Sequence, residues 1–284
     1  MSNPVVRATR IGPHAHHYVH GGGHTGVVVA RFGRGFAALL DESFDPGFVT
    51  FQHPGYPLHP WAVELESTIL PQLDADCYVD KGIVYLVSEF FIDLSNATLT
   101  NLRILPWSKL GASSALQHVP DLKAAIEEAC KMKSHGALLQ EMGLHIPEEL
   151  AELLVKQIGR GPGSTPSGDD YVVGQLAVQW ALHEVSEEAR RQLAGFQRLC
   201  HWDDLKEKTP IGSAQMILAA AAGQFPEPVG SVMQTLTMDL DGGFHWPAMK
   251  ALSQQGVTSG TATLAGILDG LTYLGTTDCL KDLQ

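Results

Sequence analysis

The sequence predicts an α+β protein, with a β-rich N-terminal domain over residues 1–115 and an α-helical domain over residues 116–284. Runs of β-branched and aromatic residues with a period of two dominate the first part. After residue 116 the apolar residues recur at helical spacing instead. The chain of 284 residues is 44% hydrophobic, which is sufficient for two cores of ordinary size.

The β-rich domain is expected to be an antiparallel sheet or a small barrel. Segments 26–32 and 35–41 flank Gly33 and Arg34, which predicts a tight hairpin. Residues 61–66 alternate between apolar and acidic side chains, with Glu64 and Glu66 on the polar face. Residues 82–95 predict one bent strand or two successive strands, and a short helix is expected near residues 67–73.

Histidines are concentrated near the N-terminus. Five of them lie in eleven residues, without a carboxylate or cysteine to complete a defined metal geometry. We interpret the segment as a flexible, solvated arm, with a transition-metal site as the alternative. These residues are His14, His16, His17, His20 and His24.

The second half predicts a bundle of helices. Leu122, Ile126 and Ala129 form one helical stripe, and Pro147 is expected to begin a helix that ends at Gly159. Residues 169–182 are apolar nearly all round, which favours a central helix. Residues 186–199 are polar enough for a surface helix, and the last long helix follows Ser259.

The stretch GRGPGSTPSGDD, residues 159–170, combines four glycines with two adjacent carboxylates. Its Ser167–Gly168 pair recurs as Ser259–Gly260, and a second glycine follows six positions later in each case, at Gly174 and Gly266. Glycine inside a helix costs about 1 kcal/mol relative to alanine, so matched glycines indicate a packing requirement. The repetition predicts two helices with equivalent N-termini and close mutual packing.

These N-termini are candidates for an anion site, because a helix N-terminus carries free N–H groups and a partial positive charge. The alternative is ordinary capping and turn chemistry, which uses the same residue types. The candidate substrate-binding residues are Gly161, Gly163, Thr165, Ser167, Gly168, Thr258, Ser259 and Gly260.

Asp169 and Asp170 are the candidate catalytic residues. Two carboxylates would repel an anion, so a simple phosphate cradle does not account for them. They could hold a divalent metal such as Mg²⁺ that bridges to the substrate, or one could deprotonate an amine nucleophile. The alternative is that one complements the helix dipole and the other caps the helix.

The stretch GRGPGSTPSGDDYVVG resembles the signature GxGPGLTPSGDDxLxG of the AllH-type small subunit family of oxamate carbamoyltransferase, from anaerobic allantoin degradation. GVTSGTATLAGIL is similar to a second block of that family, GHTSGADTLLG, and TPIGSAQMILAAAAG is similar to a third. The sequence departs from the pattern at Ser164, in place of leucine, at Val257, in place of histidine, and at Ala262, in place of aspartate.

The resemblance implies a subunit of a carbamoyltransferase complex in purine or allantoin nitrogen catabolism. Its partners would be an FdrA-like large subunit and a third subunit, and carbamoyl phosphate would exchange its carbamoyl group with an amide or amine such as oxamate. Two alternatives stay open: a non-catalytic scaffold or regulatory subunit that binds a small anion, and a stand-alone metal-dependent enzyme that uses Asp169 and Asp170.

The formal net charge of −12 argues against nucleic acid and anionic membrane surfaces as partners. The four cysteines lie far apart without a CxxC pair, which argues against a zinc site or disulfide framework. The N-terminus lacks the apolar run of a signal peptide, and residues 216–222 are too short to span a bilayer. We therefore expect a cytoplasmic protein.

Overall fold

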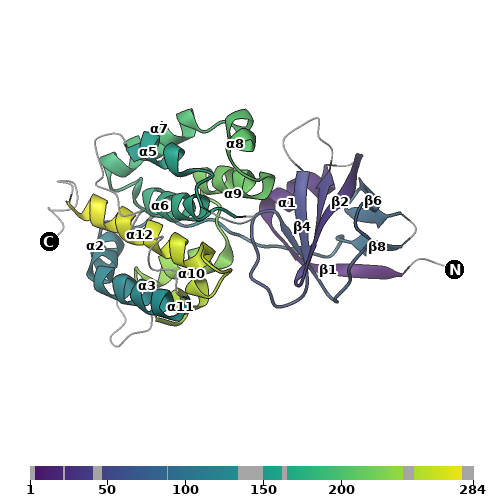
Figure 1. Cartoon of the computed structure of the whole chain (residues 1–284), viewed down its shortest axis with the longest axis horizontal. Coiled ribbons are helices and arrows are strands. Elements are labelled where there is room, and N and C mark those ends of the chain that lie inside the picture. The colour runs from purple at the N-terminus through teal and green to yellow at the C-terminus, as the bar shows by residue number, and fades with distance from the viewer. Residues whose placement is uncertain are drawn as a thin grey trace. The chain divides into compact units, whose positions relative to one another are not determined.

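The computed structural model of the chain divides into two compact units, Met1–Leu102 and Arg103–Gln284 (Figure 1). The first consists of strands with one helix and the second of helices, which confirms the predicted α+β class. The boundary predicted at residue 115 falls inside helix α2 (Lys109–Gln117). The structure describes residues 4–21, 23–40, 47–87, 89–133, 150–161, 165–238 and 246–276, with the side chains of residues 131–133 and 276 excepted.

The first unit is a sheet that closes on itself. Its strands are β1 (Val5–Ile11), β2 (His24–Phe32), β3 (Gly35–Leu40), β4 (Gly47–Gln52), β5 (Ala62–Leu65), β6 (Asp76–Asp80), β7 (Ile83–Leu86), β8 (Phe90–Asp93) and β9 (Thr98–Leu99). They follow the order β5-β4-β3-β2-β6-β7-β8-β1-β9, and an additional pairing of β5 with β1, the strand next to β9, closes the sheet. Of the two expected arrangements, the structure therefore has the small barrel.

The strand pairs agree with the predicted hairpin and with the option of two successive strands in residues 82–95. Strands β2 and β3 pair antiparallel across the Gly33–Arg34 turn, and residues 82–95 form two strands, β7 and β8, that also pair antiparallel. The sheet is nevertheless mixed, because β1 runs parallel to β8 and β9, and β4 runs parallel to β5. The expectation of antiparallel pairing is wrong for these pairs.

The expected short helix near residues 67–73 is absent, and this segment consists of bends and irregular backbone. Pro71 has no amide hydrogen to donate within a helix. Leu70 and Leu73 are exposed. Ile69 packs against the barrel core from irregular backbone, so the segment reaches that core without forming a helix.

The histidine-rich segment differs from the flexible arm that the sequence suggested. Residues Pro13–His20 form helix α1, which buries Ala15, Tyr18 and Val19. The hydroxyl of Tyr18 donates to the carbonyl oxygen of Leu40 at 2.8 Å. These apolar anchors at positions 15, 18 and 19 hold the helix to the barrel.

The alternation of residues 61–66 gave a wrong prediction for the exposure of Glu64. The polar face was expected to carry Glu64, yet this side chain is buried beside Arg10, with 2.8 Å between Oε2 and the guanidinium Nη2. The hydrogen bonds from Arg10 lower the pKa of the Glu64 carboxyl group, although burial acts in the opposite direction. A closed sheet can bury a charged side chain when a partner from another strand neutralises it.

The second unit is helical. Besides α2, its helices are α3 (Val119–Lys133), α5 (Leu150–Gln157), α6 (Ser167–Leu182), α7 (Glu187–Leu199), α8 (Trp202–Lys208), α9 (Ile211–Ala221), α10 (Glu227–Thr235), α11 (Trp246–Ser253) and α12 (Ser259–Thr276). In the part of the chain that the structure describes, none of the helices combines the length and apolar character needed to cross a membrane. The helix start predicted at Pro147 lies outside the described residues.

Helices α6 and α12 run alongside each other through the helical unit (Figure 1). Helix α6 is buried along nearly its whole length, as predicted from the apolar residues on nearly all of its faces. A Cβ atom added to Gly174 would lie 2.1 Å from the carbonyl oxygen of Thr263, and one added to Gly266 would lie 2.1 Å from that of Tyr171. The two helices are therefore in backbone contact, and the packing role predicted for the repeated glycines is confirmed.

Candidate functional site

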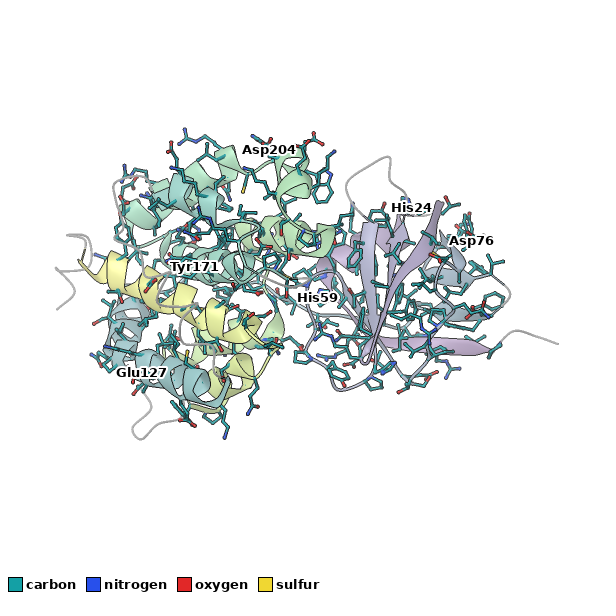
Figure 2. All side chains as sticks on the ribbon, viewed as in Figure 1. His24, His59, Asp76, Glu127, Tyr171 and Asp204 are labelled. Atoms are coloured by element: carbon teal, nitrogen blue, oxygen red, sulfur yellow. The ribbon has the colours of Figure 1, made fainter. Side chains whose placement is uncertain are left out.

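The N-termini of α6 and α12 lie together at one end of the pair. Thr165 Oγ1, in the turn before α6, is 3.1 Å from Ser259 Oγ, the first residue of α12. Farther along, the Tyr171 hydroxyl on α6 donates to Asp269 Oδ2 on α12 at 2.9 Å; Figure 2 labels Tyr171 in the helical unit. The helices are thus parallel, and the two Ser-Gly pairs of the sequence meet in space.

Asp169 is a buried carboxylate with both oxygens occupied. Its Oδ1 accepts a hydrogen bond from the amide of Gly159 at 2.7 Å, and its Oδ2 accepts one from the hydroxyl of Thr209. Burial raises the pKa of Asp169, and the hydrogen bonds from Gly159, Thr209 and Ser213 oppose that rise. Asp169 therefore ties the turn before α6 to the start of α9.

Asp170 has a different environment, although it is the next residue. The Ser259 hydroxyl hydrogen-bonds to its carboxyl group, but Oδ2 is buried without a hydrogen-bond partner among the described residues. Burial, and to a smaller extent the neighbouring Asp169 carboxylate, raise the pKa of Asp170 to about 7. Asp170 can therefore exchange a proton near neutral pH.

The first amides of α6 already have acceptors within the protein. The amide of Gly168 donates to the carbonyl oxygen of Arg160 at 2.9 Å, and the amides of Asp169 and Asp170 donate to that of Pro166 at 2.9 and 3.4 Å. In α12, the amide of Gly260 donates to the carbonyl oxygen of Gln255 at 3.0 Å. Recognition of an anion here would consequently use hydroxyl groups more than these four backbone amides.

The glycines of the motif have packing reasons. A Cβ atom on Gly168 would lie 2.1 Å from the carbonyl oxygen of Gln157, and one on Gly260 would lie 1.7 Å from that of Leu252. Gly161 has a φ of +104°, and its Cβ would lie 2.4 Å from Ser167 Oγ. Each position requires glycine for close approach between protein segments, independently of a ligand.

The other predicted substrate-binding residues differ in how exposed they are. Thr165 is exposed, whereas Thr258 and Ser259 are half-buried. The carbonyl oxygen of Thr258 accepts from the amide of Ala262 at 2.9 Å, which makes Thr258 the residue that opens α12. Gly163 lies outside the described residues, as does Ser164, the position where leucine was expected from the resemblance.

The sequence interpretation omitted a third helix N-terminus at this place. Thr209 and Ser213, which flank the start of α9, both hydrogen-bond to Asp169. A signal was present, because Thr-Pro-x-Gly occurs at residues 165–168 and again at residues 209–212. That repetition marks two helices with the same entry geometry, each with proline as the N-cap residue.

The geometry bears on the alternative of a metal held by the aspartate pair. Each oxygen of Asp169 already accepts a hydrogen bond from a protein group, whereas Oδ2 of Asp170 has no partner among the described residues. Across the described ranges, no group of three or more His, Cys, Asp and Glu side chains is arranged to hold a metal ion.

Comparison with known proteins bears on the same part of the chain. Neither the curated proteins nor the solved structures contain a match. The family model described as oxamate carbamoyltransferase subunit AllH matches residues 157–271. The matched segment begins at the end of α5 and ends within α12, so it includes the starts of α6, α9 and α12. The match confirms the resemblance found in the sequence, and over residues 157–271 this chain is similar to the oxamate carbamoyltransferase subunit AllH family.

Proposed function

We propose that the chain is a subunit of a cytoplasmic carbamoyltransferase complex in nitrogen catabolism, of the kind found in allantoin and purine degradation. It would exchange a carbamoyl group between carbamoyl phosphate and an amide or amine such as oxamate. An FdrA-like large subunit and a third subunit would be its partners. The family match over residues 157–271 supports this assignment, because the matched segment contains the whole candidate site.

The observation that carries the chemical part of the proposal is the state of Asp170. Its Oδ2 is buried at the junction of α6 and α12 and has no hydrogen-bond partner among the described residues, and burial raises its pKa to about 7. A general base is most effective when its pKa lies near the working pH. Asp170 therefore suits proton transfer from the nitrogen of the acceptor.

In the forward step, the acceptor nitrogen attacks the carbamoyl carbon of carbamoyl phosphate. The new N–C bond forms, the C–O bond to phosphate breaks, and phosphate leaves with that electron pair. The proton lost by the nitrogen passes to the Asp170 carboxylate. Asp169 is a positioning residue in this scheme, because both its oxygens hold protein donors from Gly159 and Thr209.

The proposal is tested by assaying carbamoyl transfer to oxamate with the chain alone and with the two partner subunits. We expect activity in the complex, and a loss of about 10²–10⁴-fold in Asp170→Asn. Asp269→Asn is the matched control, since Asp269 is another partly buried carboxylate of the same helix pair with a raised pKa, bonded to Tyr171. We expect this control to retain activity.

Assembly of each variant is checked by size-exclusion chromatography, so that loss of activity is separated from loss of the complex. Wild-type activity in an assembled Asp170→Asn complex would contradict the role of Asp170 and favour a scaffold that only binds an anion. Metal-dependent activity from the isolated chain would contradict the proposal that the chain acts as a subunit of a complex.

A further inference from the structure

Ser167 and Ser259 occupy equivalent positions as the first residues of α6 and α12, but their hydroxyl groups differ in partners. Ser259 Oγ lies 3.1 Å from Thr165 Oγ1 and also hydrogen-bonds to the Asp170 carboxyl group. Ser167 is 2% exposed, and its Oγ has no hydrogen-bond partner among the described residues. In the described part of the chain, the hydroxyl of Ser259 thus has two partners and the buried hydroxyl of Ser167 has none.

The helix pair has an internal twofold relation that explains the difference. A Cβ atom on Gly174 would lie 2.1 Å from the oxygen of Thr263 and 3.0 Å from the nitrogen of Ile267. A Cβ atom on Gly266 would lie at the same two distances from the oxygen of Tyr171 and the nitrogen of Gln175. Every residue of this set is related to its counterpart by the same sequence offset as Ser167 and Ser259.

Under that relation, each partner of Ser259 has a counterpart at the same sequence offset. The counterpart of Thr165 is Val257, and the counterpart of Asp170 is Ala262. Neither side chain can accept or donate a hydrogen bond. The position equivalent to Asp170 carries a methyl group instead of a carboxylate, which agrees with the absence of a partner for the Ser167 hydroxyl among the described residues.

A buried hydroxyl without a partner costs free energy, and native proteins rarely keep one without a reason. Ser167 and Asp170 stand three residues apart in α6, so their side chains lie on the same face of the helix. Ser167 Oγ and Asp170 Oδ2, which have no hydrogen-bond partner among the described residues, thus belong to one face of α6.

We propose that the carboxylate of the acceptor substrate replaces the side-chain carboxylate missing at position 262. It accepts a hydrogen bond from Ser167 Oγ, as Asp170 does from Ser259, and it directs the amide nitrogen of the acceptor toward Asp170 Oδ2. The inference rests on the proposed function and adds an orientation to it. A small amide with an adjacent carboxylate, the chemistry of oxamate, has both groups that this orientation requires.

An anionic oxygen on the ligand could also come from phosphate, so the experiment has two arms. Binding of oxamate and of inorganic phosphate to the full-length chain is measured by calorimetry at pH 8. In Ser167→Ala we expect oxamate binding to weaken about tenfold, because a hydrogen bond to a charged group is lost. Phosphate binding should change less than twofold.

Ala262→Asp tests the same idea from the other side, since the new carboxylate would accept the Ser167 hydrogen bond itself. We expect it to weaken oxamate binding more than tenfold by occupying the niche. Thr272→Asp is the charge control, because it adds the same charge to an exposed position of α12. If Ala262→Asp fails to fold, oxamate binding by Ser167→Ala still tests the inference. Ser167→Ala should fold, because it removes only a hydroxyl group that has no partner among the described residues.

Unchanged oxamate binding in Ser167→Ala would overturn the inference, and so would a loss confined to phosphate. The assembled complex separates this inference from the proposed function. Carbamoyl transfer with an unaltered KM for oxamate in Ser167→Ala overturns the orientation alone. Absence of transfer by the wild-type complex contradicts the function, while the expected binding pattern would still support the niche beside Ala262.

Discussion

Asp169 and Asp170 show how adjacent, chemically identical residues acquire different properties. The Asp169 carboxylate has protein donors on both oxygens, whereas Oδ2 of Asp170 has none in the described structure. The cause lies in the helical geometry, because successive side chains on α6 point in directions about 100° apart. One therefore faces the start of α9 and the other the start of α12.

The raised pKa of Asp170 has a consequence for stability. The folded value of about 7 exceeds the ordinary value of 3.8, so the folded state retains the proton more strongly than the unfolded chain does. The stability contributed by this protonated group is fully present below pH 3.8 and is lost as the pH rises through about 7. Asparagine does not titrate and is free of this loss.

We therefore expect Asp170→Asn to gain stability relative to the wild-type protein as the pH rises from 5 to 8, by about 2 kcal/mol. Urea unfolding at the two pH values measures the difference between the two proteins. Asp203 lies at an exposed surface position. The difference in free energy of unfolding between Asp203→Asn and the wild-type protein should therefore be the same at pH 5 and pH 8. A difference that is independent of pH would mean that Asp170 titrates normally in the folded protein.

At this scale the sequence predicted the aspartate pair as the chemical centre of the site but not the division between its members. That division depends on Thr209, Ser213 and Ser259, which are remote in the chain and come into contact only through folding. The departures from the family pattern at Val257 and Ala262 were visible in the sequence. Their relation to Ser167 required the twofold arrangement of the helices.

Among the elements, the contact between α6 and α12 decides the geometry of the site. Both helices use a glycine at the crossing point, and each glycine faces a backbone carbonyl of the other helix. A side chain at either position would separate the N-termini that hold Thr165, Asp170 and Ser259 together. The packing of two elements and the position of the candidate groups are therefore coupled.

We expect Gly174→Ala and Gly266→Ala each to destabilise the protein by about 2 kcal/mol or more, because the added methyl group would overlap a backbone oxygen. Gly230→Ala in α10 is the matched control, since a Cβ atom there meets nothing within 4 Å. It should stabilise the protein by up to about 1 kcal/mol. Chemical denaturation compares the three variants; equal effects at all three positions would show that α6 and α12 are not in backbone contact.

The sequence predicted helices well from the apolar stripe in α3 and from the apolar character and matched glycines of α6 and α12. It failed at residues 67–73, where Pro71 has no amide hydrogen to donate within a helix and Leu70 and Leu73 remain exposed. It also missed the parallel strand pairs, because period-two alternation reports burial and not the direction of the neighbouring strand.

For the whole molecule, the two units have separate cores. The largest hydrophobic cluster extends from Ile104 to Leu274, and two smaller clusters lie between Val6 and Leu102. No cluster of buried apolar residues in the described part of the chain draws members from both units. Each unit therefore meets the main physical condition for folding by itself.

We expect residues 103–284, expressed alone, to fold cooperatively, since their core and the contacts between α6, α9 and α12 are internal to them. Circular dichroism would show a helical spectrum, and urea would produce a single transition. Residues 116–284 are the informative comparison, because they lack Ile104 and Trp107 of this core and the start of α2. They should be less stable. A non-cooperative fragment 103–284 would mean that the helical unit depends on the barrel.

The dependence of kcat/KM on pH for carbamoyl transfer by the assembled complex tests the central claim most directly, namely that Asp170 accepts the proton of the acceptor nitrogen. Wild-type activity should fall as the pH drops below about 7, because protonated Asp170 cannot act as a base. Asp269→Asn should keep this profile, whereas Asp170→Asn should lose both the acidic limb and most of the activity. An acidic limb that persists unchanged in an active Asp170→Asn complex would contradict the claim.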